Sequence, residues 1–336
     1  MRALVTGGAG FIGTHLSHHL LAGGHHVLSV DDLSTGDAAN ISELTSRPGY
    51  EFVKGSVLDG ALMDDLVAQV DTVFHLAAAV GVKRILDQPF EGLRTNLQGT
   101  ETVLDCAHRH RTRIMVASTS EVYGKSCADS LNEESDRVVG SPLTMRWSYA
   151  EAKALDETLA YLYWTEHQVP AVIVRLFNVS GPRQSGRYGM VIPRLIDQAL
   201  RNEPLTVYGD GQQTRCFCHV ADIVAGLVAL TEAPDAYGNV FNLGRPEEVT
   251  ILRLAERVIE LSGSASPIRY VPYDEAYSDG FEDMRRRVPD ISRAREVVGF
   301  DPRRDLDEII LSVIEDHRLP GVEKDREHRP KAGNVR

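Results

Sequence analysis

The 336-residue chain has few cysteines and no long apolar segment. Its four cysteines, Cys106, Cys127, Cys216 and Cys218, form neither a C-x-x-C pair nor a disulfide framework, so a reducing cytosol is the expected compartment. The N-terminus carries glycines where a signal peptide would be apolar, and no run of residues is long and apolar enough to span a bilayer. We therefore expect a soluble, cytoplasmic protein with no membrane partner.

Basic residues are also fewer than acidic ones, with 36 Lys and Arg against 48 Asp and Glu and a net charge of -12. This balance argues against a broad nucleic-acid surface, although a few arginines could still surround one small phosphate ligand. The histidine pairs at residues 18–19 and 25–26 have no cysteine or carboxylate cluster beside them. No metal site is therefore expected.

Short β-branched runs alternate with helical patterns in the first half of the chain. This alternation predicts a doubly wound parallel sheet of the Rossmann type, with helices on both faces and right-handed connections. The predicted buried strands are residues 2–5, 27–30, 51–53, 72–76, 114–117 and 171–176.

The pattern changes after residue 178, where glycine and proline interrupt shorter elements. Residues 179–317 are expected to form a smaller, mostly helical substrate-binding lobe, with some later segments returning to the first domain. Apolar residues at helical spacing predict an amphipathic helix over residues 251–259. The polar residues 318–336 are expected to be a disordered tail.

A glycine-rich turn, residues 6–13 (TGGAGFIG), joins the first predicted strand to a helix. Gly7 permits a tight turn, Gly10 lets the backbone approach a pyrophosphate, and Gly13 lets the helix pack closely on the strand. The helix N-terminus then offers free N–H groups to the anion. Residues 1–178 are therefore predicted to be a dinucleotide-binding domain.

Asp31 ends the second predicted strand, where a carboxylate can bind the ribose hydroxyls of the adenosine. This carboxylate would repel a ribose phosphate, so NAD is predicted rather than NADP. Asp32 competes for the same role. A solvated acidic pair next to an ordinary turn is the alternative interpretation.

Tyr149 and Lys153 are four residues apart and so share one face of a predicted helix. The lysine ammonium is expected to lower the pKa of the phenol, so that Tyr149 can take a proton from a sugar hydroxyl. Upstream, residues 117–124 (ASTSEVYG) follow a predicted strand, and doubly wound sheets bind ligands at such strand ends. Taken alone, either motif could be a chance spacing or a Ser/Thr-rich turn.

Together these motifs resemble the extended short-chain dehydrogenase/reductase family, which contains nucleotide-sugar epimerases, dehydratases and decarboxylases. The resemblance spans residues 1–315 and includes residues 75–78 (HLAA), 175–178 (RLFN), 181–183 (GPR) and 287–290 (RVPD). It implies a tightly held NAD that oxidises a sugar C4 hydroxyl to a ketone. It also implies a homodimer with a four-helix interface, formed by residues 91–110 and 149–167 of two chains.

The resemblance further implies roles for individual residues. The implied catalytic residues are Thr119, Ser120, Glu121, Tyr149, Lys153 and Arg215. Besides the three glycines and the two aspartates, the implied NAD contacts are Phe11, Ile12, Ser56, Val57, Leu76, Ala77, Ala78, Asn96, Tyr149 and Lys153. The implied contacts of the sugar nucleotide are Asn178, Tyr208, Gln213, Arg215 and Arg287, with Arg287 on the diphosphate.

Ser120 and Glu121 determine which subclass the chain resembles. Sugar 4,6-dehydratases of the family carry Asp-Glu at these positions, and UDP-galactose 4-epimerases generally lack the Glu. The Ser-Glu pair, residues 146–149 (RWSY) and residues 213–217 (QTRCF) resemble UDP-xylose synthases and bacterial UDP-glucuronate decarboxylases. The resemblance therefore implies decarboxylation of UDP-glucuronate to UDP-xylose or to UDP-4-keto-pentose.

Two alternatives remain open at this point. Residues 185–190 (SGRYGM) and the arginine run 285–287 resemble epimerases as much as decarboxylases, which leaves a UDP-glucose or UDP-glucuronate 4-epimerase possible. The other alternative is a non-catalytic NAD-binding regulator on the same fold. UDP is favoured over TDP by resemblance alone.

Overall fold

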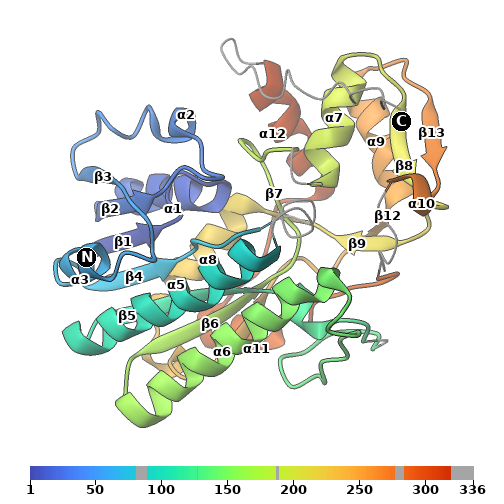
Figure 1. The fold of residues 1–336 in the computed structure, drawn as a ribbon. Helices are drawn as coiled ribbons and strands as arrows, with labels where there is room; N and C mark the ends of the chain where they lie inside the picture. The colour runs from blue at the N-terminus through green and yellow to red at the C-terminus, as the bar shows by residue number, and fades with distance from the viewer. Residues whose placement is uncertain (81–88, 127, 187–188, 277–283, 319–336) are drawn as a thin grey trace, which may run out of the picture.

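The computed structural model describes residues 1–80, 89–126, 128–186, 189–276 and 284–318 (Figure 1). Apart from its first residue, the predicted tail at residues 318–336 lies outside the described residues.

A parallel sheet of seven strands forms the centre of the larger lobe (Figure 1). The strand order is β11-β6-β5-β4-β1-β2-β3, and every neighbouring pair is parallel. The strands are β1 (Arg2–Thr6), β2 (His26–Asp31), β3 (Tyr50–Lys54), β4 (Thr72–His75), β5 (Arg113–Thr119), β6 (Ala171–Leu176) and β11 (Val240–Leu243). The predicted doubly wound sheet is confirmed, and all six predicted strands overlap observed ones.

Helices cover both faces of this sheet, because successive residues of each strand point to opposite sides. In β1, Ala3 and Val5 belong to one apolar core and Leu4 to another. The first core is completed by α1 (Phe11–Ala22), α8 (Val220–Glu232) and α11 (Ser292–Val298). The second is completed by α3 (Gly60–Val67), α5 (Pro89–His110) and α6 (Ser148–His167). Shorter elements in this lobe are α2 (Ala38–Ile41), η1 (Ser120–Tyr123), η2 (Met145–Trp147) and η3 (Pro234–Ala236).

The smaller lobe has its own apolar core between α7 (Val191–Leu200), α9 (Ile251–Ser262) and α12 (Leu306–Arg318). The predicted amphipathic helix over residues 251–259 is confirmed as part of α9. Two-stranded pairings accompany the helices: β7 (Val179–Ser180) with β10 (Cys218–His219), β8 (Leu205–Tyr208) with β13 (Ile268–Val271), and β9 (Thr214–Cys216) with β12 (Glu248–Thr250). The remaining short helix is α10 (Tyr273–Ala276).

Within the described ranges, no helix combines the length and apolar character needed to cross a membrane. The same residues contain no cluster of three His, Cys, Asp or Glu side chains that could hold a metal ion.

Candidate active site

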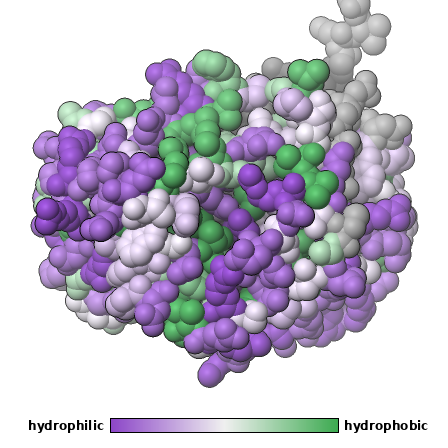
Figure 2. Space-filling view, turned by 90° about the horizontal axis from the view of Figure 1, so that it is seen from below, coloured by the Kyte–Doolittle hydropathy of each residue, from purple (hydrophilic) through white to green (hydrophobic). Residues whose placement is uncertain are grey.

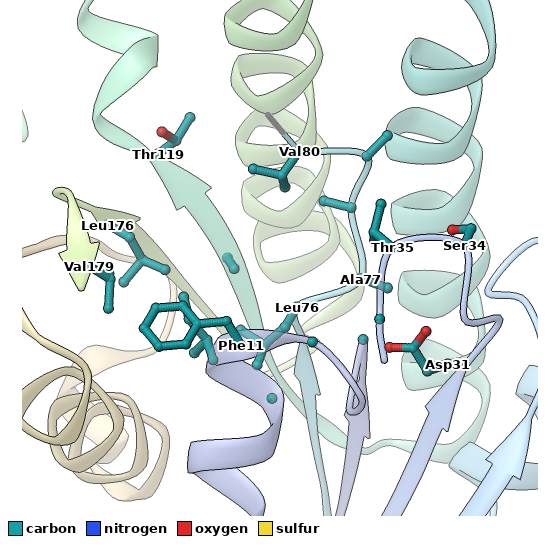
Figure 3. A pocket seen from close by; sticks show the side chains of 18 of the residues that line it. Phe11, Asp31, Ser34, Thr35, Leu76, Ala77, Val80, Thr119, Leu176 and Val179 are labelled. Carbon is teal, nitrogen blue, oxygen red and sulfur yellow. The ribbon is translucent and has the colours of Figure 1, made fainter. Parts of the chain in front are cut away.

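A pocket of about 680 Å³ lies at the carboxyl ends of the central strands. Figure 3 shows Asp31, Ser34 and Thr35 at one end of the pocket and Thr119 at the other, with Phe11 and Leu76 between them. The residues predicted for the site line this pocket with four exceptions, which are Asn96, Tyr208, Gln213 and Arg215.

The turn between β1 and α1 has no room for side chains on its glycines. Gly7 has a φ of 69°, a conformation that favours glycine, and a Cβ there would lie 2.9 Å from the backbone nitrogen of Ala77. A Cβ on Gly13 would collide with the carbonyl oxygen of Gly7. No side chain caps the start of α1 at Gly10, so backbone N–H groups there can bind an anion.

Asp31 is the buried acidic residue at the end of the pocket nearest this turn. Its carboxylate accepts hydrogen bonds from the backbone N–H groups of Ala9 (3.0 Å) and Leu33 (2.8 Å). Burial raises the pKa of Asp31, and these two hydrogen bonds oppose the shift. Asp32 also lines the pocket but is exposed, and its carboxylate accepts from the Ser34 N–H. Asp31 therefore remains the better placed of the two for a ribose.

Asn96 supports the pocket wall from behind. It is 2% exposed, and its Oδ1 accepts a hydrogen bond of 2.7 Å from the Ala79 N–H. The Thr6 hydroxyl similarly accepts from the N–H groups of Leu76 and Ala77. These buried side chains hold the segment after β4 with its pocket-lining residues in place.

The carboxylate of Glu121 lies between two arginines at the Thr119 end of the pocket. Nη1 of Arg287 donates to Oε1 of Glu121 at 2.7 Å and to the Ser120 hydroxyl at 3.0 Å. Arg146 lies 3.2 Å from the other carboxylate oxygen. Burial alone would raise the pKa of Glu121, but Arg287 and Arg146 outweigh it and the pKa is lowered. Glu121 is therefore ionised at neutral pH.

Tyr149 and Lys153 lie on α6 and both line the pocket, as their spacing predicts. Lys153 is 2% exposed, and its Nζ donates to Oδ2 of Asp156 at 3.0 Å. Burial raises the pKa of Tyr149, and the carboxylates of Glu121 and Asp156 raise it further. The predicted lowering by Lys153 is thus wrong for this structure, because burial of the phenol raises its pKa and the two nearby carboxylates add to the shift.

A buried ion pair anchors α6 to the sheet. Arg175 of β6 donates to both carboxylate oxygens of Glu157 in α6, at 2.9 and 2.7 Å, and to the Tyr123 hydroxyl at 2.9 Å. The Ser118 hydroxyl, near the end of β5, donates to the same carboxylate. Arg175 and Glu157 are 6% and 7% exposed. This network fixes the strand ends against the helix that carries Tyr149.

Tyr208, Gln213 and Arg215 lie in the smaller lobe, outside the pocket lining. The Gln213 Nε2 donates to the Tyr208 carbonyl oxygen at 3.0 Å, and the Arg194 guanidinium lies 4.1 Å from the centre of the Tyr208 ring. Arg215 is close enough to Glu121 to contribute to the lowering of its pKa. The roles of these three residues in binding a sugar nucleotide stay predictions.

Three charged residues of the site region were not assigned from the sequence. Arg146 directly precedes the Trp-Ser-Tyr stretch, and its pairing with Glu121 depends on the tertiary fold. Asp156 follows Lys153 by three residues, a helical spacing that could have indicated the pair. Arg183 lines the pocket and belongs to the motif at residues 181–183 (GPR), to which no function was assigned from the sequence.

The model of the NAD dependent epimerase/dehydratase family matches residues 3–244. The chain belongs to this family, and NAD is its cofactor.

Relatives and solved structures agree with this membership. A UDP-N-acetyl-alpha-D-glucosaminuronate decarboxylase of Bacillus cytotoxicus is 41% identical over 302 residues, which cover 90% of this chain and 92% of that protein. UDP-glucuronic acid decarboxylase 1 of Arabidopsis thaliana is 37% identical over 318 residues, which cover 95% and 70%. The structure of UDP-glucuronic acid 4-epimerase from Bacillus cereus, in complex with UDP-glucuronic acid and NAD, has a TM-score of 0.84 at 30% identity and covers 94% of this chain and 98% of that one.

The pocket fits a dinucleotide of this kind. Gly7 and Gly13 allow the tight packing of the turn, and the uncapped start of α1 at Gly10 offers its backbone N–H groups to a pyrophosphate. The Asp31 carboxylate suits two ribose hydroxyls and disfavours a ribose phosphate. Lys153 and Tyr149 line the opposite part of the same pocket, where they could contact the nicotinamide half.

Proposed function

We propose that this chain decarboxylates UDP-glucuronate through a 4-keto intermediate and releases UDP-xylose or UDP-4-keto-pentose. The arrangement of Glu121 between Arg287 and Arg146, at the end of the pocket that also contains Tyr149, carries the proposal. Two guanidinium groups against one carboxylate leave a net positive site, which suits a sugar that bears its own carboxylate. The names of the two decarboxylase relatives support decarboxylation of a UDP-uronic acid, and the Arabidopsis relative is named for UDP-glucuronic acid.

The first step removes the proton of the C4 hydroxyl and the hydride on C4 of the sugar. The phenol oxygen of Tyr149 would accept the proton of the C4 hydroxyl, which requires the bound substrate and cofactor to lower the raised pKa of this group. The Thr119 hydroxyl would bind the C4 oxygen. When bound, NAD would supply the acceptor for the hydride that leaves C4. The product is a β-keto acid, whose ketone withdraws electrons from the bond between C5 and C6.

The second step breaks the bond between C5 and C6. Carbon dioxide departs, and the electron pair is delocalised as an enolate onto the C4 oxygen, where the Thr119 and Tyr149 hydroxyls can stabilise it. Arg287 and Arg146 would hold the substrate carboxylate until it leaves, and Arg215 would contact the phosphates. Because Glu121 is ionised, it would orient these arginines and a water that protonates C5. Return of the hydride to C4 and of the Tyr149 proton to the C4 oxygen would then give UDP-xylose, whereas release of the 4-keto pentose would leave the cofactor reduced.

The alternative functions have weaker support. The fold agrees equally well with a 4-epimerase, because the similar Bacillus cereus structure is that of a 4-epimerase. The two relatives with higher sequence identity, however, are named decarboxylases. A non-catalytic regulator would not need Thr119, Tyr149 and Lys153 together in one pocket. The Bacillus cytotoxicus relative makes UDP-N-acetylglucosaminuronate a second candidate substrate.

Mass spectrometry of the purified protein with NAD and each of the two UDP-uronic acids tests the proposal. We expect loss of one carbon dioxide, and the product then shows whether the pentose or the 4-keto pentose is released. An unchanged mass with a new chromatographic isomer would instead identify a 4-epimerase. No change with any UDP-uronic acid would reject the enzymatic proposal.

The substitution Glu121→Gln is expected to lower the decarboxylation rate by about 100-fold or more, because a neutral amide no longer fixes two guanidinium groups. The matched control is Glu151→Gln, which removes one carboxylate from the exposed side of α6. Comparable losses in both variants would argue against a catalytic role for Glu121.

We also propose that two copies of the chain pair through α5 and α6. These helices lie side by side and carry exposed apolar side chains. Figure 2 views the lower side of the molecule in Figure 1 and shows hydrophobic patches between hydrophilic residues. The exposed apolar residues of the two helices are Phe90, Leu93, Leu155, Tyr161 and Leu162.

A cytosolic location remains our prediction, supported by the buried free thiols of Cys106, Cys216 and Cys218.

Light scattering after size exclusion should give the mass of a dimer for the unaltered protein. Leu155→Glu is expected to produce monomers at micromolar concentration, since a two-fold axis places each substitution in the interface twice. Leu311→Glu on α12 is the control, because Leu311 is similarly exposed (41% against 47%) but lies in the other lobe. A dimer that survives Leu155→Glu would contradict the proposed interface.

A further inference from the structure

Arg183 has a backbone conformation that few residues other than glycine adopt. Its φ is 65°, in the left-handed region, where a non-glycine residue is strained and where such strain is often associated with function. The backbone N–H of Arg183 donates to Oδ2 of Asp316 at 2.7 Å, and Asp316 belongs to α12 and is 7% exposed. The smaller lobe therefore holds this residue in its unusual conformation.

The side chain of Arg183 points to the opposite wall of the pocket. Nη1 donates to the carbonyl oxygen of Asn40 at 2.7 Å, and Nη2 donates to Oε2 of Glu43 at 2.9 Å. Nη1 also lies 3.4 Å from Nε2 of His18. Burial and then the charge of Arg183 lower the pKa of His18, so its ring is neutral at pH 7 and can accept this contact.

Asn40 belongs to the segment that covers the adenosine end of the pocket. Residues 31–37 and Asn40 all line the pocket. The Asn40 Nδ2 donates to the carbonyl oxygen of Ala9 at 3.0 Å, inside the glycine turn, and the Asp37 N–H donates to the same oxygen. Arg183 therefore connects α12 to the wall that the glycine turn supports.

We propose that Arg183 retains the dinucleotide in the pocket, by bridging the two walls between which NAD must pass to enter or leave. The Glu43 end of the bridge is 68% exposed and adds little by itself. The bond to the Asn40 carbonyl comes from a guanidinium that is only 22% exposed, so it is the main contact across the pocket. This proposal requires NAD binding alone and holds whichever sugar nucleotide the enzyme converts.

Retention also suits the proposed chemistry. If the hydride taken from C4 returns to the same sugar, the cofactor ends each turnover in its starting form. A protein that works in this way gains nothing from releasing NAD between turnovers.

The test measures the exchange of bound NAD for isotopically labelled NAD in the purified protein. Arg183→Met is expected to accelerate release about 10- to 100-fold, which corresponds to the loss of one charge-assisted hydrogen bond. Arg183→Lys keeps the charge but reaches only one of the two acceptors, so an intermediate rate is expected. The control is Arg47→Met, which removes an exposed arginine from the connection that follows α2 and should leave the rate unchanged.

The affinity for UDP, measured on the same variants, shows whether Arg183 acts on NAD alone or supports the fold in general. We expect it to change less than twofold. Equal weakening of UDP and NAD binding would mean that Arg183 only maintains packing between the lobes, and would overturn the proposal. Unchanged NAD exchange in Arg183→Met would also overturn it, and if that variant does not fold, unchanged exchange in Arg183→Lys would do the same.

Discussion

Replacement of Tyr149 by phenylalanine is expected to lower turnover by about 10²- to 10⁴-fold while NAD and the sugar nucleotide still bind. The substitution removes only the hydroxyl that takes the C4 proton, and the ring can keep its place on α6 beside Lys153. Single-turnover measurement of reduced NAD, by its absorbance, would show that the loss falls on the oxidation step.

Tyr161→Phe provides the comparison for this result. Tyr161 lies on the same helix, but it is 51% exposed and does not line the pocket. Turnover in this variant should match the unaltered protein. If Tyr149→Phe retained turnover within a fewfold of normal, another group would have to accept the proton.

Replacement of Arg175 by methionine is expected to lower the free energy of unfolding by about 3–5 kcal/mol, because it leaves the Glu157 carboxylate buried without its partner. Burial lowers the pKa of Arg175, but the contacts with Glu157 and Tyr123 raise it more. Urea unfolding of the NAD-free protein would measure the loss.

Two further variants test whether the unpaired buried carboxylate causes the expected loss of stability. The double substitution Arg175→Met with Glu157→Leu should recover much of the lost stability, since it removes both ions. Arg295→Met disrupts an exposed pair with Asp301 and should cost less than about 1 kcal/mol. If the double variant were no more stable than Arg175→Met, the unpaired carboxylate would not explain the loss.

The sheet and the glycine turn were predictable because their signals are local. Each buried strand is a short apolar run, and Gly7 and Gly13 stand where the backbone tolerates no Cβ. Tyr149 and Lys153 were predictable as a pair because helical periodicity alone places them on one face.

The electrostatics of the site were not predictable in the same way. The sign of the Tyr149 pKa shift depends on burial and on the carboxylates of Glu121 and Asp156. Arg287 was expected at the diphosphate, yet its guanidinium contacts Glu121, which is 166 residues away in the chain. Such distances are set by the folding of the smaller lobe against the sheet, and no spacing in the sequence encodes them.

The late position of β11 in the chain has a consequence for protein synthesis. β6 is complete at Leu176, but its outer neighbour begins only at Val240, roughly 60 residues later. At about 5–20 residues per second, the ribosome needs about 3–12 s to make that stretch. During this time the apolar strand β6 has an open row of N–H and C=O groups, which can pair with another nascent chain. Aggregation during translation is therefore a hazard that ends when β11 docks.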